Sequence, residues 1–224
     1  MDHETTTCGR CGGTGKYSFN LMHGSRCYGC GGTGKALTKR GQRARRFLQA
    51  LYLRPASEIA VGEQVRESVG MLGPEKWHRV TAVGSYNESG DIALDLKRGS
   101  HEVKRITAPH ATLKSVRDQA HLDQLIAAAA AYEASLDEDG KPTNWTRRVG
   151  AHFLPIPGEP HLSMIVAKAS DGEYVIGVQD DRLNAFGNID ARDTLAQAKR
   201  RAQELVESCH YRGLIPTPAA AQAA

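Results

Sequence analysis

A repeated nine-residue segment near the start of the chain constrains its fold more than any other feature. The first copy, CGRCGGTGK, begins at Cys8, and the second, CYGCGGTGK, begins at Cys27, so the offset is 19 residues. The repeat contains four of the five cysteines of the chain: Cys8, Cys11, Cys27 and Cys30. Four cysteines clustered in this way predict a small unit of their own, which we place at residues 1–36.

The spacing of these cysteines favours a tetrahedral metal site. A gap of two residues lets both sulfurs of a pair reach one ion from a single tight turn, and a second pair completes the ligand set. We therefore expect all four cysteines to bind one structural Zn²⁺ ion, because no position is left open for water or substrate. A reduced, metal-free loop and a redox dithiol are the alternatives to this interpretation. A unit of about 30 residues with few apolar side chains should need the metal in order to fold.

The full repeat, Cys-x-x-Cys-x-Gly-x-Gly, resembles the cysteine-rich zinc domain of DnaJ-type co-chaperones. The matching positions are Cys8, Cys11, Gly13 and Gly15 in one copy and Cys27, Cys30, Gly32 and Gly34 in the other. In that family four repeats build two zinc centres that are implicated in polypeptide binding and chaperone activity. The resemblance therefore implies one zinc centre here and a protein client as partner. It covers about 30 of the 224 residues, and the His-Pro-Asp tripeptide of the J domain does not occur in the sequence.

The two halves of the chain differ in charge. Residues 1–115 contain 18 Lys and Arg against 10 Asp and Glu, whereas residues 116–224 contain 11 against 15. A basic surface of this kind is a candidate for binding a polyanion. The cations that we expect to contact phosphates are Lys16, Lys35, Arg40, Arg43, Arg45 and Arg46. Tyr17, Phe19 and Tyr28 are candidates for stacking on bases, and packing around the zinc unit is the alternative role for these rings.

The middle of the chain predicts one helix, a group of short strands and a second helix. Residues 37–55 predict a basic connecting helix, because apolar residues recur at helical spacing up to Pro55. Residues 56–114 contain five short runs in which apolar and polar residues alternate. These runs predict a small β-barrel, since closure removes unpaired edges, and their order resembles a Src-homology-type or KOW-like barrel. Residues 115–140 predict a helix that is capped by Ser115.

The C-terminal part of the chain predicts a βββα unit at residues 141–213. Its expected strands are 151–155, 162–169 and 173–179. Its helix is expected to open at Asp190 or Asp193. The order of these elements resembles HicB-type and double-stranded-RNA-binding-like modules. Residues 214–224 are expected to form a disordered tail, so the whole chain predicts an α+β fold that is made of several small modules.

No metalloprotease, nucleophile-elbow or phosphate-binding-loop motif occurs in the sequence. We therefore expect a non-enzymatic, zinc-binding accessory protein that binds DNA or RNA through its basic N-terminal half. A DnaJ-like adaptor that binds a protein client is the alternative, and an enzyme with its site in the C-terminal unit is a third reading. No apolar run is long enough to span a bilayer, and the first residues lack a signal-peptide pattern. These features predict a cytoplasmic protein without a membrane partner.

Overall fold

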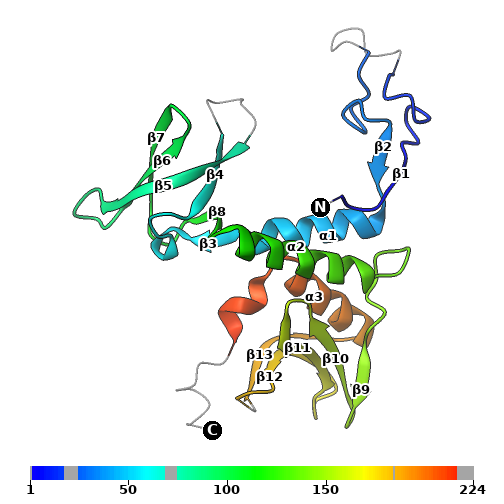
Figure 1. Cartoon of the computed structure of the whole chain (residues 1–224). Coiled ribbons are helices and arrows are strands. Elements are labelled where there is room, and N and C mark those ends of the chain that lie inside the picture. The colour runs from blue at the N-terminus through cyan, green and yellow to red at the C-terminus, as the bar shows by residue number, and fades with distance from the viewer. Residues whose placement is uncertain (1, 18–24, 69–74, 184, 216–224) are drawn as a thin grey trace. The chain divides into compact units, whose positions relative to one another are not determined.

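The structure, a computed structural model, describes residues 2–17, 25–68, 75–183 and 185–215. Within these ranges the chain is a mixed α+β protein with three α-helices and three antiparallel sheets (Figure 1), so the predicted α+β class is confirmed. The helices are α1 (Lys39–Leu51), α2 (Gln119–Ala134) and α3 (Leu195–Glu207). Among the described residues, none of the helices has the length and apolar character that crossing a membrane requires. Of the predicted tail at 214–224, residues 216–224 lie outside the described ranges, as does the candidate stacking residue Phe19. Its first residue, Leu214, instead ends a short 3₁₀ helix, His210–Leu214.

Contacts within the chain divide it into two compact units. Unit 1 consists of Met1–Phe47 and Ala129–Ala224, and unit 2 consists of Leu48–Ala128. The divisions fall inside α1 and α2 rather than in linkers. The N-terminal cysteine repeat and the C-terminal sheet, which the sequence analysis treats as separate modules, therefore belong to one unit.

A two-stranded sheet closes the cysteine repeat of unit 1. Its strands β1 (Thr5–Thr7) and β2 (Lys35–Leu37) pair antiparallel, with Thr5 opposite Leu37. Helix α1 follows at once, because the Thr38 hydroxyl accepts a hydrogen bond of 3.1 Å from the amide of Gly41. Gly41 weakens this first turn by propensity, but a Cβ there would lie 2.4 Å from the carbonyl oxygen of Glu4. Close approach of the N-terminal segment explains the glycine.

The second sheet of unit 1 is a five-stranded meander. Its strands are β9 (Thr146–Arg148), β10 (Ala151–Ile156), β11 (Glu159–Lys168), β12 (Tyr174–Asp180) and β13 (Ala185–Arg192). The strand order is β13-β12-β11-β10-β9, so the expected βββα unit has two more strands than predicted. Both additional strands lie at the sheet edges. β9 was missed because it is three residues long, polar and exposed, with the sequence TRR.

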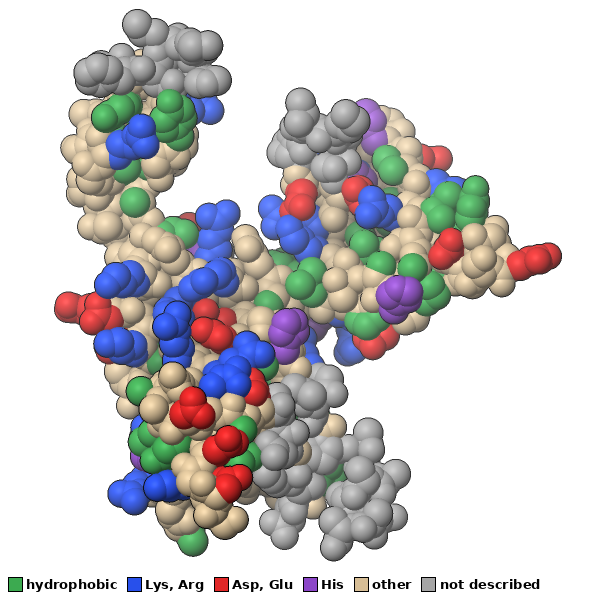
Figure 2. Space-filling model, turned by 180° about the vertical axis from the view of Figure 1, so that it is seen from behind, with side chains coloured by type: hydrophobic (Ala, Val, Ile, Leu, Met, Phe, Trp, Pro, Cys, Tyr) green, Lys and Arg blue, Asp and Glu red, His purple; other side chains and the backbone are tan. Residues whose placement is uncertain are grey.

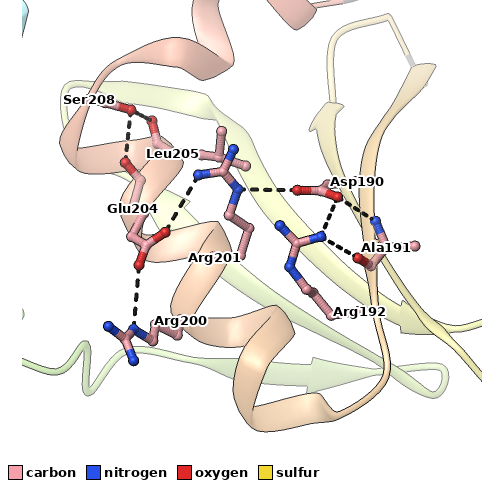
Figure 3. Close-up of polar contacts among 8 residues, drawn as sticks. All are labelled: Asp190, Ala191, Arg192, Arg200, Arg201, Glu204, Leu205 and Ser208. Carbon is pink, nitrogen blue, oxygen red and sulfur yellow. Dashed lines mark hydrogen bonds and ion pairs between the residues drawn. The ribbon is translucent and has the colours of Figure 1, made fainter.

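Helix α3 packs against strands β11, β12 and β13 of this sheet. The helix buries Ala198, Ala202, Leu205 and Val206, and the sheet buries Leu154, Met164, Val166, Ile176 and Val178. The predicted helix start at Asp190 or Asp193 is wrong, because β13 runs to Arg192 and the Thr194 hydroxyl caps the helix. Asp190 instead accepts a hydrogen bond of 3.1 Å from Arg201 of α3, which joins the helix to its edge strand (Figure 3).

Unit 2 is built around a six-stranded antiparallel sheet. Its strands are β3 (Leu53–Pro55), β4 (Gln64–Ser68), β5 (Glu75–Ser85), β6 (Ile92–Arg98), β7 (His101–Thr107) and β8 (Thr112–Val116). A short 3₁₀ helix, Ala56–Glu58, follows β3. The strand order is β3-β8-β4-β5-β6-β7. Among the described residues β3 and β7 are therefore edges, and the strand pairings give an open sheet where the sequence predicts barrel closure.

A hydrophobic cluster fills one side of the unit 2 sheet. Its buried members are Ala56, Ile59, Val65, Val80, Leu94, Leu96 and Leu113. β8, the last strand of this sheet along the chain, contains Ser115, so the predicted cap of α2 is wrong. The Asp118 carboxylate takes that role and accepts a hydrogen bond of 2.7 Å from the amide of His121. The helix begins later than predicted because β8 continues to Val116.

Candidate metal centre

The four cysteines of the repeat lie together in unit 1. All four Sγ atoms lie within 4.8 Å of one another. The distance between the sulfurs of Cys8 and Cys27 is 4.0 Å, and that between Cys11 and Cys30 is 3.8 Å. A tetrahedron with metal–sulfur bonds of about 2.3 Å has an edge of about 3.8 Å. The sulfurs are therefore spaced to bind one metal ion.

The two copies of the repeat hold one another in matching positions. The amide of Cys8 donates to the carbonyl of Gly34, and the amide of Cys27 donates to the carbonyl of Gly15, both at 2.9 Å. Within each copy a threonine hydroxyl donates to the carbonyl of the second cysteine. These bonds, from Thr14 to Cys11 and from Thr33 to Cys30, are both 2.8 Å long. The repeat in the sequence is thus a repeat in hydrogen bonding, and it places the two cysteine pairs face to face.

Two glycines are required where the copies meet. Gly15 and Gly34 have φ angles of 72° and 77°, in the left-handed region. A Cβ at Gly15 would lie 2.3 Å from the carbonyl oxygen of Gly32, and one at Gly34 would lie 2.1 Å from that of Gly13. These contacts exclude any side chain. The last glycine of each Cys-x-x-Cys-x-Gly-x-Gly copy therefore allows the close approach that brings the cysteines together.

Backbone amides point at the sulfurs. Gly15 donates to the sulfur of Cys11 and Gly34 donates to that of Cys30, both at 3.3 Å. Burial raises the pKa of the Cys30 thiol, but hydrogen bonds from the amides of Gly34 and Gly32 outweigh this effect and lower the pKa to about 6. The same opposition of burial and amide bonds leaves the pKa of Cys11 below its usual value. The amide bonds thus favour the thiolate at Cys11 and Cys30, and thiolates are the form that binds metal. Burial has the opposite effect at Cys27, where it raises the pKa of the thiol.

No family model, curated protein or solved structure matches the chain. The assignment of a metal centre therefore rests on the positions of its own sulfurs and amides. The resemblance to DnaJ-type zinc domains stays an expectation from the repeat motif. The structure shows a cluster of four cysteines that could hold an ion.

Three of the predicted phosphate-binding arginines form ion pairs inside unit 1. Arg40 lies 3.2 Å from a carboxylate oxygen of Glu4. Arg43 and Arg46 both pair with Glu207, whose side chain is only 8% exposed. The same carboxylate accepts a hydrogen bond of 2.9 Å from Tyr132. A buried carboxylate needs such partners, so Arg43 in particular has a structural role in this arrangement.

The other predicted cations are exposed. Lys16, Lys35 and Arg45 form no ion pair within the part of the chain that the structure describes. Lys35 and Arg45 line one groove of about 660 Å³ between the cysteine repeat and α1. Cys30 lines the same groove, so the metal centre forms part of its wall. The structure thus brings two of the six predicted cations together beside the metal centre.

Two tyrosine rings of the cysteine repeat, Tyr17 and Tyr28, contact the side chain of Arg10. The guanidinium carbon of Arg10 lies 4.7 Å from the ring centroid of Tyr17 and 4.7 Å from that of Tyr28. These cation–π contacts give the two rings a packing role in the repeat. Tyr28 keeps 55% of its surface exposed.

The acidic partners of these basic residues lie far from them in the sequence. Glu4 is 36 residues from Arg40 and Glu207 is 164 residues from Arg43, so no local spacing indicates the pairs. The remaining cysteine, Cys209, is buried, and burial raises the pKa of its thiol to about 11. It belongs to the core rather than to the metal centre.

Proposed function

We propose that the chain is a zinc-dependent accessory protein that binds nucleic acid through unit 1. Four thiolates are the ligand set that favours Zn²⁺ in a tetrahedral site. Because the protein supplies all four ligands, the metal has a structural role and leaves no position for a substrate. One ion would fix the two copies of the repeat and thereby the surface beside them.

The groove that Lys35 and Arg45 line carries this proposal. The described residues of its lining include no carboxylate, and the other polar side chains there include Thr33 and Gln42, which can bond to oxygen atoms. A surface with free cations and neutral donors suits the phosphates of a nucleic acid. Cys30 lies in its wall, so binding at the groove should depend on the metal.

A titration of labelled oligonucleotides tests the proposal. Fluorescence anisotropy of single-stranded and duplex DNA and RNA should show binding at low salt that weakens steeply as salt is raised. Arg45→Glu and Lys35→Glu should each weaken binding about 10-fold or more. Lys168→Glu, at an exposed position in β11, changes the net charge equally and should leave the affinity unchanged. Absence of binding by the zinc-loaded wild-type chain at low salt would contradict the proposal.

Arg43 and Arg46 are poor positions for this test. Replacing them removes the partners of a buried carboxylate on Glu207, so a lost affinity would be confused with a lost fold. Arg45 lies between them in the sequence but is exposed, without an ion pair among the described residues. Arg45→Glu therefore separates a loss of affinity from a loss of the fold.

A protein-interaction adaptor is the second candidate, and the same groove favours it in one respect. Leu37 and Ala36 line it with apolar surface beside the cations. A polypeptide client would use this apolar surface, so Leu37→Asp should abolish suppression of client aggregation while Arg45→Glu leaves it intact. If Arg45→Glu abolished the suppression of aggregation and Leu37→Asp left it intact, the adaptor would be ruled out and the nucleic-acid proposal would be retained.

A further inference from the structure

A second pocket of unit 1, of about 530 Å³, lies between α1, the segment that follows α2, and α3. Its apolar wall contains Trp145 and Pro142, and its basic wall contains Arg43, Lys141, Lys199 and Arg200. Among the described residues, no carboxylate lines it. Figure 2 shows Lys and Arg side chains gathered on this unit, with Asp and Glu side chains among them. A ligand for this pocket needs a flat apolar part and negative charge.

The carboxylates around the pocket are each shared between two cations. The pairs are Arg43 and Arg46 with Glu207, Lys39 and Lys141 with Asp139, and Arg200 and Arg201 with Glu204. The last set lies on one side of α3 (Figure 3). Arg201 also pairs with Asp190 at 3.1 Å, but in the Glu207 and Asp139 sets one negative charge serves two positive charges. The basic side chains there keep an excess of positive charge that can attract an anion.

Lys199 differs from its basic neighbours. It forms no ion pair among the described residues, and its ammonium lies 5.0 Å from the ring centroid of Trp145. Burial lowers the pKa of Lys199. Burial also lowers the pKa of the nearby His152, and the positive charges of Lys199 and Arg147 add to that effect. The ammonium is thus held over an aromatic face in a region of positive potential without a carboxylate of its own.

We propose that this pocket takes one nucleotide of a single-stranded nucleic acid, with the base replacing the Lys199 ammonium on the face of Trp145 and the adjacent phosphates on Lys199 and Arg200. An aromatic ring stacks with any base, and lysine and arginine at its sides bind the backbone. Lys199 and Arg200 both lie on α3, and Arg43 and Lys141 add cations from two other segments, which suits the several phosphates of a strand better than a ligand with a single carboxylate. The inference rests on the proposed function and adds a second contact region to it.

The test uses the zinc-loaded full chain with Trp77→Phe, which leaves Trp145 as the single tryptophan of the sequence. A short oligothymidylate should quench Trp145 fluorescence over the same concentration range in which the anisotropy of its labelled copy rises. Lys199→Ala and Trp145→Leu should each weaken oligonucleotide affinity about 10-fold. Lys168→Ala serves as the matched loss of one positive charge outside the pocket.

The possible results separate this pocket from the proposed function. Oligonucleotide binding without quenching, with wild-type affinity in both pocket variants, would overturn the pocket and leave the proposed function standing. Absence of any oligonucleotide binding by the wild-type chain would overturn both. Quenching by thymidine monophosphate or phosphotyrosine, but not by the oligonucleotide, would show a small-ligand pocket and contradict the inference.

Discussion

The cysteine repeat and the C-terminal sheet belong to one unit, but different forces hold them together. Among the described residues of 2–37, the buried hydrophobic side chains are Cys8 and Cys27. The sheet with α3 instead buries a continuous set of aliphatic side chains, such as Met164 and Val178. We therefore expect the repeat to depend on four ligand atoms and the sheet to depend on apolar area. One part should fail when a single ligand is lost, and the other should tolerate the loss of a single contact.

Loss of a ligand should have the largest effect. Cys11→Ser, or removal of metal with a chelator, should abolish zinc binding and unfold the repeat, because structural zinc contributes about 10–16 kcal/mol in small zinc units. Zinc content and backbone NMR spectra would measure both changes. Cys209→Ser, which alters a buried cysteine outside the cluster, should keep one zinc ion. Unfolding of the five-stranded sheet together with the repeat would contradict the contrast between the two regions.

A cavity in the sheet should have the next largest effect. Leu154, with 2% of its surface exposed, lies in β10. Leu154→Ala should lower the free energy of unfolding by about 2–5 kcal/mol, from lost apolar burial and the cavity left behind. Chemical denaturation would measure the change. The zinc content should stay at one ion per chain, and a loss of zinc in this variant would show that the repeat depends on the sheet.

Substitutions of glycine in the repeat test how closely its two copies fit together. Gly34→Ala would place a Cβ at a left-handed φ and 2.1 Å from a backbone oxygen. Gly12→Ala would be strained only by its φ of 57°, because its Cβ would lie in open space. Gly9→Ala meets neither obstacle. Since the left-handed region costs about 1–2 kcal/mol, zinc affinity should fall most for Gly34, less for Gly12 and not at all for Gly9. Competition with a chelator would rank the three, and equal affinities would contradict the fit between the two copies.

The smallest expected effect is a pH response of the sheet. The Asp180 side chain is fully buried, and its hydrogen bond with Arg182 holds the pKa of the carboxyl below its usual value. Because its pKa is lowered, the ionised Asp180 carboxylate stabilises the fold above about pH 4. This stabilisation is lost as the pH falls further. Asp180→Asn should therefore flatten the acid decline in the free energy of unfolding, followed by NMR signals of the sheet. Asp171→Asn, which removes an exposed carboxylate, controls for charge, and an unchanged decline in Asp180→Asn would contradict the assignment.

The sequence predicts best the features that are set by local spacing. The placement of the four cysteines follows from two-residue gaps and glycines at fixed positions, and the cluster of sulfurs agrees with it. Strands β5, β6 and β10 to β12 follow from alternation of apolar and polar residues. In these segments burial and local pattern indicate the same structure.

Features that depend on distant partners could not be predicted in this way. Strand β9 has no apolar pattern, and its three residues pair with β10. Ser115 has the chemistry of a helix cap, but β8 takes it into the sheet of unit 2. The partner of Arg43 lies 164 residues away. Tertiary pairing, rather than local propensity, decides each of these cases.

The central claim is that four cysteines bind one zinc ion that organises the repeat. X-ray absorption at the zinc edge of the purified chain tests it most directly, together with the metal content. We expect one zinc per chain with four sulfur ligands at about 2.3 Å. A metal-free folded repeat, or a zinc ion with nitrogen or oxygen ligands in place of a sulfur, would contradict it.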